Sequence, residues 1–453
     1  MPHVWCGNQY HNGIGRKGLL VAPVRYRADA VVSCDEEFSV YRPGVIDVAG
    51  GRIAWVGPAQ DAPLGHGVEH RLSGLVMPGL VNTHCHSAMT LFRGAAEDMP
   101  LQRFLNDVLW PREAHLTEQD VYWGMSLACA ELLRCGVTTS CEMYFFEAAQ
   151  LRAVVDAGFR SVITSAIPAF PDLGSWERRL DETLAFHDRF AGSHDRVQIG
   201  FGPHSPYALS LDALDTVAAA ARDRNALVQI HIAENEQECR EFEDKHGRRI
   251  PTMLAERGFF EGRVLAAHSV WLTDDDLAIY RERDVAVAHC PTSNAKLASG
   301  AARLADMCRL GLRVGLGTDG PASNNDLDLW EDMRLASLVA RLRTGDPSVI
   351  SAPEALALAT TGGAKALGWN DIGSLTSGRW ADMVLVRSTD LSFIPQTTER
   401  DLLSHLVWSA SSRLVSEVWV AGERVVKDGQ CLTVDVERAQ REVQQRANRL
   451  AAV

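Results

Sequence analysis

The sequence has no paired cysteine motif, no excess of positive charge and no apolar run of membrane-spanning length. Its ten cysteines are scattered without a CxxC pair, which is typical of reduced cytoplasmic thiols and argues against a disulfide scaffold or a Cys-ligated zinc. The longer apolar runs, such as Gly74 to Val81, are broken by residues like Pro78 and fall well short of a membrane span. Because no basic segment followed by an apolar stretch opens the chain, we expect no secretory signal and a cytoplasmic protein.

The charge balance is acidic. Lys and Arg number 45 against 58 Asp and Glu, and the formal net charge of −13 repels phosphate backbones and anionic lipid headgroups. We therefore expect neither nucleic acid nor a membrane as a partner. The apolar and charged fractions, 46% and 23%, are those of an ordinary globular protein, and 453 residues suffice for one large domain and a smaller one. A homo-oligomer is a further candidate state, on the general frequency of symmetric assemblies alone.

What the chain does contain is a regular alternation of short apolar runs with longer helical patterns. Runs rich in Val, Ile and Thr that alternate with helices are typical of βα units around a parallel sheet. Eight such runs are Gly79 to His84, Gly136 to Met143, Arg160 to Ile167, Val197 to His204, Leu227 to Glu234, Val264 to Val270, Val285 to Pro291 and Arg313 to Asp319. Eight units predict a (β/α)8 TIM-like barrel, in which catalytic groups project from the C-terminal ends of the strands.

The chain divides into four predicted segments. Residues 79–372 form the barrel. Alternating strand patterns in residues 28–78 and 373–433, with turn signals at Gly50-Gly51 and Ala421-Gly422, predict one small β-sandwich domain built from both chain ends. Residues 434–453 have the pattern of a polar amphipathic helix. Residues 1–27 show no clear period, so we assign them no structure.

Histidines gather at the predicted strand ends. His84 and His86 close the first run two residues apart, so they share one face of the strand while the residue between them points away. His231 lies near the end of the fifth run, and Asp319 ends the eighth. A single histidine is most often an ordinary hydrogen-bonded residue. Three imidazoles and a carboxylate at one barrel mouth instead predict an open catalytic site for one divalent metal ion, with Zn²⁺ the first choice and Fe²⁺ the second.

Two further groups suit proton transfer. Glu234 lies just beyond His231, and His268 lies near the end of the sixth run. A divalent metal lowers the pKa of water from about 16 toward about 7, and Asp319 can then accept the proton of that water. Glu234 can protonate a ring nitrogen of a bound heterocycle, and His268 can orient the attacking water. A solvated loop glutamate and a merely hydrogen-bonded histidine are the ordinary alternatives.

Other enzyme signatures are absent or misplaced. No HExxH helix and no P-C-x-x-C signature occurs, which argues against a zinc protease of that type and against the cytidine-deaminase fold. Gly315 to Gly320 matches the dinucleotide pattern GxGxxG, yet it follows the last predicted strand instead of opening a first βαβ unit. Pro321 also comes where a phosphate-binding helix should begin. We therefore reject a dinucleotide site.

Five motifs along the chain belong together: Asn82 to His86, Gly202 to Tyr207, His231 to Glu234, His289 to Lys296 and Gly317 to Asn325. They resemble those of the 5'-methylthioadenosine/S-adenosylhomocysteine deaminases of the amidohydrolase superfamily, and the resemblance extends over nearly the whole chain after Ala28. The resemblance implies the same metal ligands and proton-transfer groups as the residues themselves suggest. It also implies a purine nucleoside as the substrate.

The resemblance further implies substrate contacts. Glu113 stands where the family grips the ribose diol, and a carboxylate that accepts from two hydroxyls suits that role. His204 corresponds to a second substrate-binding histidine, and Ser323 lies in the final loop of the family. Phe104 stands where relatives carry a tryptophan over the ligand.

One position departs from the relatives that bind the homocysteine carboxylate. Ser165 stands where these relatives carry an arginine, with Arg179 as the candidate replacement. Loss of a bidentate cation weakens binding of an amino-acid tail far more than binding of a neutral methylthio group. We therefore expect a preference for a 5'-modified adenosine without that tail.

Three functions compete for these residues. The first is hydrolytic deamination of an adenosine-type nucleoside, such as 5'-methylthioadenosine, S-adenosylhomocysteine or adenosine, to the inosine-type product and ammonia. The second keeps the metal but acts on another heterocycle, as guanine deaminases and chlorotriazine hydrolases do with similar barrel motifs. The third is an inactive barrel that serves as a scaffold, and the presence of every expected ligand and proton-transfer residue speaks against it. Glu113 discriminates between the first two, because only a nucleoside offers a ribose diol.

Overall fold

The computed structural model describes residues 23–64, 67–95, 97–168 and 175–453, so most of the unassigned segment 1–27 lies outside it. In the described part, eight parallel strands follow one another around a barrel, each paired with the next along the chain. These strands are β6 (Leu80–Cys85), β7 (Val137–Tyr144), β8 (Arg160–Ile167), β9 (Val197–Pro203), β10 (Leu227–Ile232), β11 (Arg263–His268), β12 (Ala286–His289) and β13 (Val314–Leu316). Each predicted run coincides with one strand, which confirms the fold class.

Several strands end earlier than their predicted runs. β10 ends at Ile232 and β11 at His268, because Ala233 (φ 53°), His268 (φ 66°) and Ser269 (φ 51°) adopt left-handed backbone conformations. A left-handed residue turns the chain out of the extended strand. The residue that follows Ala233, Glu234, therefore lies in a loop at the mouth of the barrel.

The first and last strands of the barrel lie side by side and nearly close it. The hydroxyl of Thr83 on β6 donates to the carbonyl oxygen of Leu316 on β13 at 2.8 Å. The glycines of the GxGxxG motif lie along this seam. A Cβ on Gly315 would come within 2.4 Å of the Thr83 methyl group, and one on Gly317 within 2.8 Å of the Cβ of His84. Close approach of the two strands accounts for these glycines without any dinucleotide.

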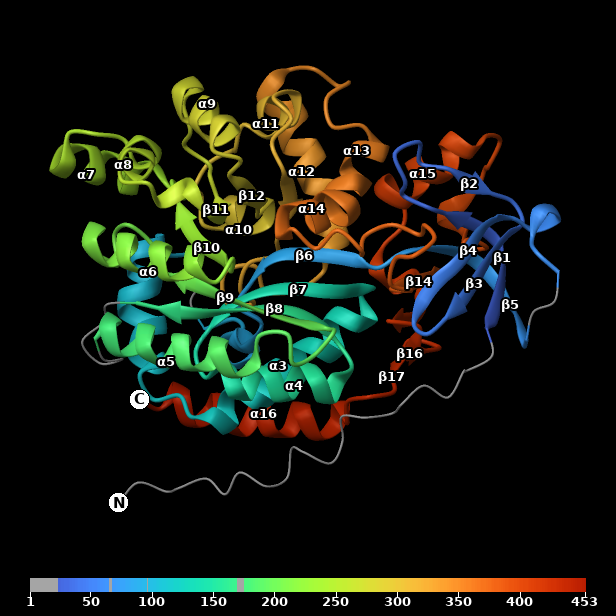
Figure 1. The fold of residues 1–453 in the computed structure, drawn as a ribbon, viewed down its shortest axis with the longest axis horizontal. Helices are drawn as coiled ribbons and strands as arrows, with labels where there is room; N and C mark the ends of the chain where they lie inside the picture. Colours follow the sequence, from blue (N-terminus) through green and yellow to red (C-terminus); the bar gives the residue numbers. More distant parts are fainter. Residues whose placement is uncertain (1–22, 65–66, 96, 169–174) are drawn as a thin grey trace.

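Helices surround the barrel (Figure 1). The helices after β6 to β13 are α3 (Glu118–Arg134), α4 (Glu147–Ala157), α5 (Trp176–Phe190), α6 (Leu211–Asp223), α7 (Glu236–His246), α8 (Ile250–Glu256), α9 (Asp274–Glu282), α10 (Pro291–Lys296), α11 (Leu304–Arg309), α12 (Leu329–Thr344), α13 (Ala352–Ala357) and α14 (Gly363–Leu367). Short helical segments between β6 and α3 supply residues that wall the mouth of the barrel. They are η2 (Ser87–Phe92), α1 (Leu101–Arg103), η3 (Phe104–Leu109) and α2 (Trp110–Glu113).

Both ends of the chain build one mixed sheet beside the barrel, which confirms that the small β domain is shared between them (Figure 1). Its order in the described part is β17-β16-β15-β14-β5-β1-β3-β4, with β2 paired to β1. The strands are β1 (Val24–Val32), β2 (Val40–Tyr41), β3 (Gly44–Ala49), β4 (Arg52–Pro58), β5 (Glu69–Pro78), β14 (Met383–Val386), β15 (Val415–Val420), β16 (Glu423–Lys427) and β17 (Gln430–Cys431). β1 begins before the boundary predicted at Ala28.

The sheet curls back on itself around its own core. The N–H of Ile53 on β4 donates to the carbonyl of Arg379, and the N–H of Ala381 donates to the carbonyl of Gly51, both at 2.9 Å. The curl encloses a cluster of buried apolar side chains that includes Val31, Ile46, Val76, Met383 and Trp419. One helix of this part was not predicted from the sequence. It is α15 (Glu399–Trp408), which lies between β14 and β15.

The last helix, α16 (Val436–Ala451), falls within the tail for which a helix was predicted. It lies along α3 (Figure 1). Arg449 and Arg446 of α16 contact the buried carboxylate of Asp120 at 2.5 and 3.5 Å. Asp120 also forms the capping box of α3 with Thr117. No helix in the described ranges is long and apolar enough to cross a membrane. The nine cysteines in the described part of the chain are all free thiols.

Candidate active site

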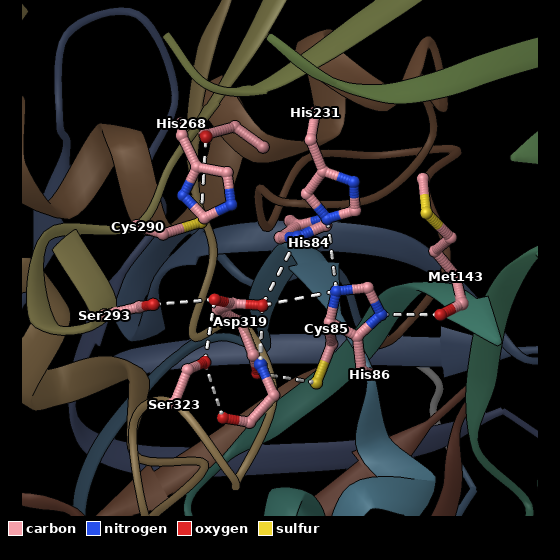
Figure 2. A network of polar contacts seen from close by, with 12 residues as sticks. His84, Cys85, His86, Met143, His231, His268, Cys290, Ser293, Asp319 and Ser323 are labelled. Atoms are coloured by element: carbon pink, nitrogen blue, oxygen red, sulfur yellow. Dashed lines mark hydrogen bonds and ion pairs between the residues drawn. The ribbon is translucent and has the colours of Figure 1, made fainter. Parts of the chain in front are cut away.

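The four predicted metal ligands, His84, His86, His231 and Asp319, converge at the C-terminal mouth of the barrel. We call them the ligand cluster. The Nε2 atoms of His84 and His86 lie 3.4 and 3.3 Å from Oδ1 of Asp319, and Nε2 of His231 lies 3.3 Å from Nε2 of His86. Figure 2 shows the three rings and the carboxylate gathered around one point, although they come from the end of β6 and the residue after it, from β10 and from the loop after β13.

Backbone carbonyls set the tautomers of two of these histidines. Nδ1 of His86 lies 2.6 Å from the carbonyl oxygen of Met143, and Nδ1 of His231 lies 2.7 Å from that of His204. A carbonyl oxygen only accepts, so both Nδ1 atoms must carry the proton. The Nε2 atoms then present lone pairs to the centre of the cluster, which is the arrangement that metal-binding histidines use.

The ligand cluster fits a divalent cation. Both ring nitrogens of His84 are buried, Nδ1 has no hydrogen-bond partner in the described part of the structure, and Nε2 faces Oδ1 of Asp319. Burial lowers the pKa of His84 to about 4 and that of His231 well below its ordinary value, so these rings are neutral at neutral pH. Neutral imidazole lone pairs that face one another repel unless a cation lies between them. Three imidazole nitrogens and one carboxylate oxygen suit Zn²⁺ or Fe²⁺.

Asp319 is held on both sides of its carboxylate. The hydroxyls of Ser293 and Ser323 donate to Oδ2 at 2.6 and 2.8 Å, and the N–H of Gly320 donates to Oδ1 at 2.8 Å (Figure 2). Burial acts to raise the pKa of Asp319, but its contacts with the imidazoles of the ligand cluster hold that pKa well below the ordinary value. The carboxylate is therefore ionised, as a metal ligand must be.

The two predicted proton-transfer groups lie beside the ligand cluster. Nε2 of His268 is 3.9 Å from Oε1 of Glu234, and both side chains are buried. Burial raises the pKa of Glu234, which favours a carboxyl group that can hand a proton to a substrate. The backbone N–H of Glu234 donates to the carboxylate of Glu238 at 2.8 Å, so the loop that carries Glu234 is tied to the start of α7.

A pocket opens over the ligand cluster. Its space, including the open mouth, is about 630 Å³. The lining residues are His86, Met89, Leu101, Phe104, Leu105, Leu109, Trp110, Glu113, Met143, Tyr144, Phe145, Ala166, His204, Tyr207, His231, Glu234, His268, Leu297, Asp319 and Ser323. One wall is therefore apolar, and the floor carries the ligand cluster and the proton-transfer groups. A flat heterocycle with a polar edge suits such a pocket.

Glu113 lies in this pocket as a buried carboxyl group. Its Oε1 accepts a hydrogen bond from the hydroxyl of Tyr144 at 2.8 Å. Burial raises the pKa of Glu113 to about 7, against the opposing effect of the Tyr144 hydrogen bond. Phe104, His204 and Ser323, the other substrate contacts that the resemblance implies, also line the pocket.

Arg179 is not among the described residues that line the pocket. Its guanidinium contacts the carboxylates of Glu147 and Glu182, both at 2.6 Å. Ser165, at the position where relatives carry an arginine, is fully buried in β8, and the next residue, Ala166, reaches the pocket instead. Neither side chain contributes a cation to the pocket wall.

Three polar residues of the site, Tyr144, Ser293 and Asn294, were not predicted from the sequence. Tyr144 is the last residue of β7, so the strand-end rule that found the histidines applies to it as well. Ser293 and Asn294 lie within the motif from His289 to Lys296, but they reach the site from α10 rather than from a strand end. No periodic signal marks that short helix as part of a site.

Comparisons with known proteins agree with this geometry. The model of the amidohydrolase family matches residues 75–425. The chain is 40% identical to the 5-methylthioadenosine/S-adenosylhomocysteine deaminase of Pelotomaculum thermopropionicum, over 95% of this chain and 99% of the relative. It is 38% identical to the 5'-deoxyadenosine deaminase of Methanosarcina mazei, over 93% of this chain and 97% of that one.

A solved structure is also similar over almost the whole length. The zinc-bound adenosine deaminase of Xanthomonas campestris aligns with a TM-score of 0.91 and 33% identity, over 95% of this chain and 99% of that chain. The family match covers most of the chain, and the relatives match nearly end to end. The chain therefore belongs to the amidohydrolase family and, within it, to the 5-methylthioadenosine/S-adenosylhomocysteine deaminase family.

Proposed function

We propose that the protein is a metal-dependent deaminase that converts an adenosine-type nucleoside to the inosine-type product and ammonia. The observation that carries the proposal is one pocket with two kinds of polar group. The ligand cluster lies at its floor next to Glu234, and the buried carboxyl group of Glu113 lies in its wall. The ligand cluster and Glu234 suit attack on an aminated heterocycle. The carboxyl group of Glu113 suits a ribose diol.

The proposed reaction assigns one task to each group. His84, His86, His231 and Asp319 would hold the cation, which would lower the pKa of a water molecule so that hydroxide is available at neutral pH. Asp319 accepts a proton from this water molecule. His268 orients the water for attack. Glu234 donates a proton to a ring nitrogen of the purine, which makes the neighbouring carbon electrophilic. The oxygen of water bonds to that carbon, and Asp319 passes the proton that it accepted to the exocyclic nitrogen. The carbon–nitrogen bond then breaks and ammonia leaves, while the remaining proton of the attacking oxygen returns to Glu234 and the ring keeps the proton that Glu234 gave it.

We propose further that the pocket prefers a neutral 5' substituent. None of the described residues that line it is Lys or Arg, and the internal segments outside the description, 65–66, 96 and 169–174, contain neither residue. The guanidinium of Arg179 is engaged by two carboxylates. A methylthio or deoxy group at the 5' carbon meets the apolar wall favourably, whereas a homocysteine carboxylate finds no partner cation there.

A panel of adenosine analogues that differ only at the 5' carbon tests both proposals. We expect an ultraviolet shift to the inosine chromophore with 5'-deoxyadenosine and 5'-methylthioadenosine. S-adenosylhomocysteine should have a kcat/KM about 10- to 100-fold lower, since each missing charged hydrogen bond is worth about 1.5–3 kcal/mol. No shift with any nucleoside would contradict the deaminase proposal. Turnover of guanine or a chlorotriazine in its place would support the second candidate activity.

Metal analysis tests the requirement for the cation. We expect about one equivalent of Zn²⁺ or Fe²⁺ in purified protein, loss of activity with a chelator, and recovery when the native metal is added back. Full activity in thoroughly chelated protein would refute the role of the ligand cluster. Cytoplasmic localisation and homo-oligomerisation are further predictions of the sequence, which cell fractionation and light scattering check.

A further inference from the structure

Two adjacent residues of α10 reach Asp319 and His268, the two groups that the proposed reaction assigns to the attacking water. The hydroxyl of Ser293 donates to Oδ2 of Asp319 at 2.6 Å, and Oδ1 of Asn294 lies 2.9 Å from Nδ1 of His268. We propose that Asn294 is a positioning residue that fixes the orientation and tautomer of His268. This inference rests on the proposed function, because it assigns His268 a role in the deamination.

The chemistry of the contact decides the tautomer. The amide oxygen of Asn294 only accepts hydrogen bonds, so Nδ1 of His268 must donate and carry the proton. In the neutral ring, Nε2 is then an acceptor, and it faces the side of the pocket where Oε1 of Glu234 lies 3.9 Å away. In the other tautomer, His268 would present a donor at that place. Asn294 therefore determines whether His268 can accept a hydrogen bond from water.

The burial of Asn294 indicates that its contact with His268, rather than apolar packing, is the reason for an asparagine at this position. The side chain of Asn294 is almost fully buried, and its Nδ2 has no hydrogen-bond partner in the described part of the chain. An unsatisfied buried donor destabilises a protein by about 1–3 kcal/mol, and an apolar residue of similar size would avoid that penalty. Among the described residues, the side chain of Asn294 forms one hydrogen bond, with His268.

The base of α10 is held rigidly enough for positioning. The N–H of Thr292 donates to the carboxylate of Asp332 on α12 at 3.1 Å. Within the helix and its exit turn, the N–H of Asn294 donates to the carbonyl of Cys290 at 3.0 Å, and the N–H of Ser299 donates to the carbonyl of Asn294 at 2.8 Å. The backbone of Asn294 is thus bonded on both sides, which limits the movement of its side chain.

Ser293 offers a matched comparison on the same helix. Asp319 retains Ser323 and the N–H of Gly320 as donors when the Ser293 hydroxyl is removed (Figure 2). Among the described residues, Asn294 is the one hydrogen-bond partner of Nδ1 of His268, so its loss leaves that nitrogen without a replacement. Loss of Ser293 should therefore act mainly on the affinity for the metal ion, and loss of Asn294 on the rate of the chemical step.

Kinetics of three variants test the assignment with metal ion in excess. We expect Asn294→Leu to lower kcat about 100-fold, the size of effect that loss of one proton-transfer group has. KM should change less than about 3-fold, and the metal content should not change. Asn294→Asp keeps the acceptor and should recover kcat to within about 10-fold of the wild type. Ser293→Ala should bind the metal ion more weakly and lower kcat by less than about 10-fold at saturation, because Ser323 and Gly320 still donate to Asp319. Equal kcat in Asn294→Leu and wild type overturns the inference.

A spectroscopic readout is independent of turnover. His268 is 1% exposed, so its imidazole N–H should exchange slowly with water and give a downfield proton resonance, assigned by its loss in His268→Asn. We expect this resonance in the wild type and in Asn294→Asp, and its loss in Asn294→Leu. If Asn294→Leu fails to fold, the wild type and Asn294→Asp decide, since absence of an Nδ1 proton in either overturns the inference. Should the wild type deaminate no nucleoside, the proposed function fails while this readout still tests the tautomer.

Discussion

At the scale of single residues, Glu113 has an unusual environment for a carboxyl group. It is buried in an apolar wall, and the described structure records a hydrogen bond to it from the hydroxyl of Tyr144. Burial disfavours its ionised form and raises its pKa to about 7. A carboxyl group that titrates near neutral pH can switch between a strong and a weak acceptor of hydroxyl hydrogen bonds. Both the contact and its pH dependence can be tested.

Glu113→Gln should raise KM for a nucleoside about 10- to 100-fold with a smaller effect on kcat. The physical reason is the loss of charge-assisted hydrogen bonds to two ribose hydroxyls, worth about 1.5–3 kcal/mol. Steady-state kinetics with 5'-deoxyadenosine measure the change. Tyr144→Phe is the matched control, because it leaves the carboxylate in place and should affect KM less. An unchanged KM in Glu113→Gln would favour a substrate without a ribose, such as a free base or a triazine.

The pKa of about 7 also predicts a pH dependence of substrate binding. Below that pH, Glu113 is protonated and is a weaker acceptor for the diol, so KM should be high. As the pH rises through about 7, the carboxylate forms and KM should fall. KM measured from about pH 5.5 to about pH 8.5 checks this trend. The curve for Glu113→Gln should be flat over that interval, and a wild-type KM that rises with pH would contradict the assignment.

At the scale of secondary structure elements, a buried carboxyl group joins two helices behind the site. Asp332 on α12 accepts from the N–H of Thr292 at the start of α10 at 3.1 Å and from the side-chain amide of Asn324 at 3.3 Å. Asp332 is fully buried, and burial raises its pKa to about 8. The folded protein therefore holds a proton there that the unfolded chain releases at a much lower pH.

This difference makes the stability depend on pH with a defined sign. Because the folded state binds more protons than the unfolded state between about pH 4 and about pH 8, the free energy of unfolding should decrease as the pH rises through that interval. We expect the decrease in Tm between about pH 6 and about pH 9 to be smaller in Asp332→Asn than in the wild type. The neighbouring exposed carboxylate supplies the control, since Glu331→Gln should leave the decrease unchanged. An identical decrease in all three proteins would contradict the raised pKa.

At the scale of the whole molecule, one buried ion pair joins the barrel to the curled sheet. Nε and Nη2 of Arg160, at the start of β8, contact the carboxylate of Asp382, just before β14, at 2.8 and 3.1 Å. The N–H of Ala421 donates to the same carboxylate at 2.6 Å. The guanidinium also lies 5.0 and 5.3 Å from the ring centroids of Trp369 and Trp380. Both side chains are buried, so removal of either partner leaves an unpaired buried charge at this boundary.

Arg160→Met or Asp382→Leu alone should destabilise the protein by about 3–5 kcal/mol, because each leaves one buried charge without its partner. The double variant should lose less than the sum of the single variants. Urea unfolding measures the three changes. The exposed pair between Arg196 and Glu423 connects the same two parts, and Glu423→Gln should lower the stability by about 1 kcal/mol or less. Additive effects at Arg160 and Asp382 would show that the pair is not coupled.

Much of the architecture is predictable from local patterns. The eight barrel strands coincide with apolar runs that have turn residues around them, because the side-chain period and the length of a strand are properties of a short segment. The candidate ligand cluster follows from one topological rule, that parallel strands place their C-terminal ends at the same mouth. That rule brings His84 and His231 together without any knowledge of the intervening contacts. The shared sheet of the two chain ends follows from strand pattern in the same way.

The tertiary structure decided what depends on distances between segments far apart in the chain. The bond from Tyr144 to Glu113, the bond from His268 to Asn294 and the pairing of Arg179 with Glu147 arise only when the barrel closes and short helices pack over its mouth. The reason is physical, because a periodic pattern specifies the direction of a side chain relative to its own backbone and not the partner that it meets. The sequence by itself therefore determined which residues face the mouth of the barrel. The closed fold decided which of them form a site and how their protons are arranged.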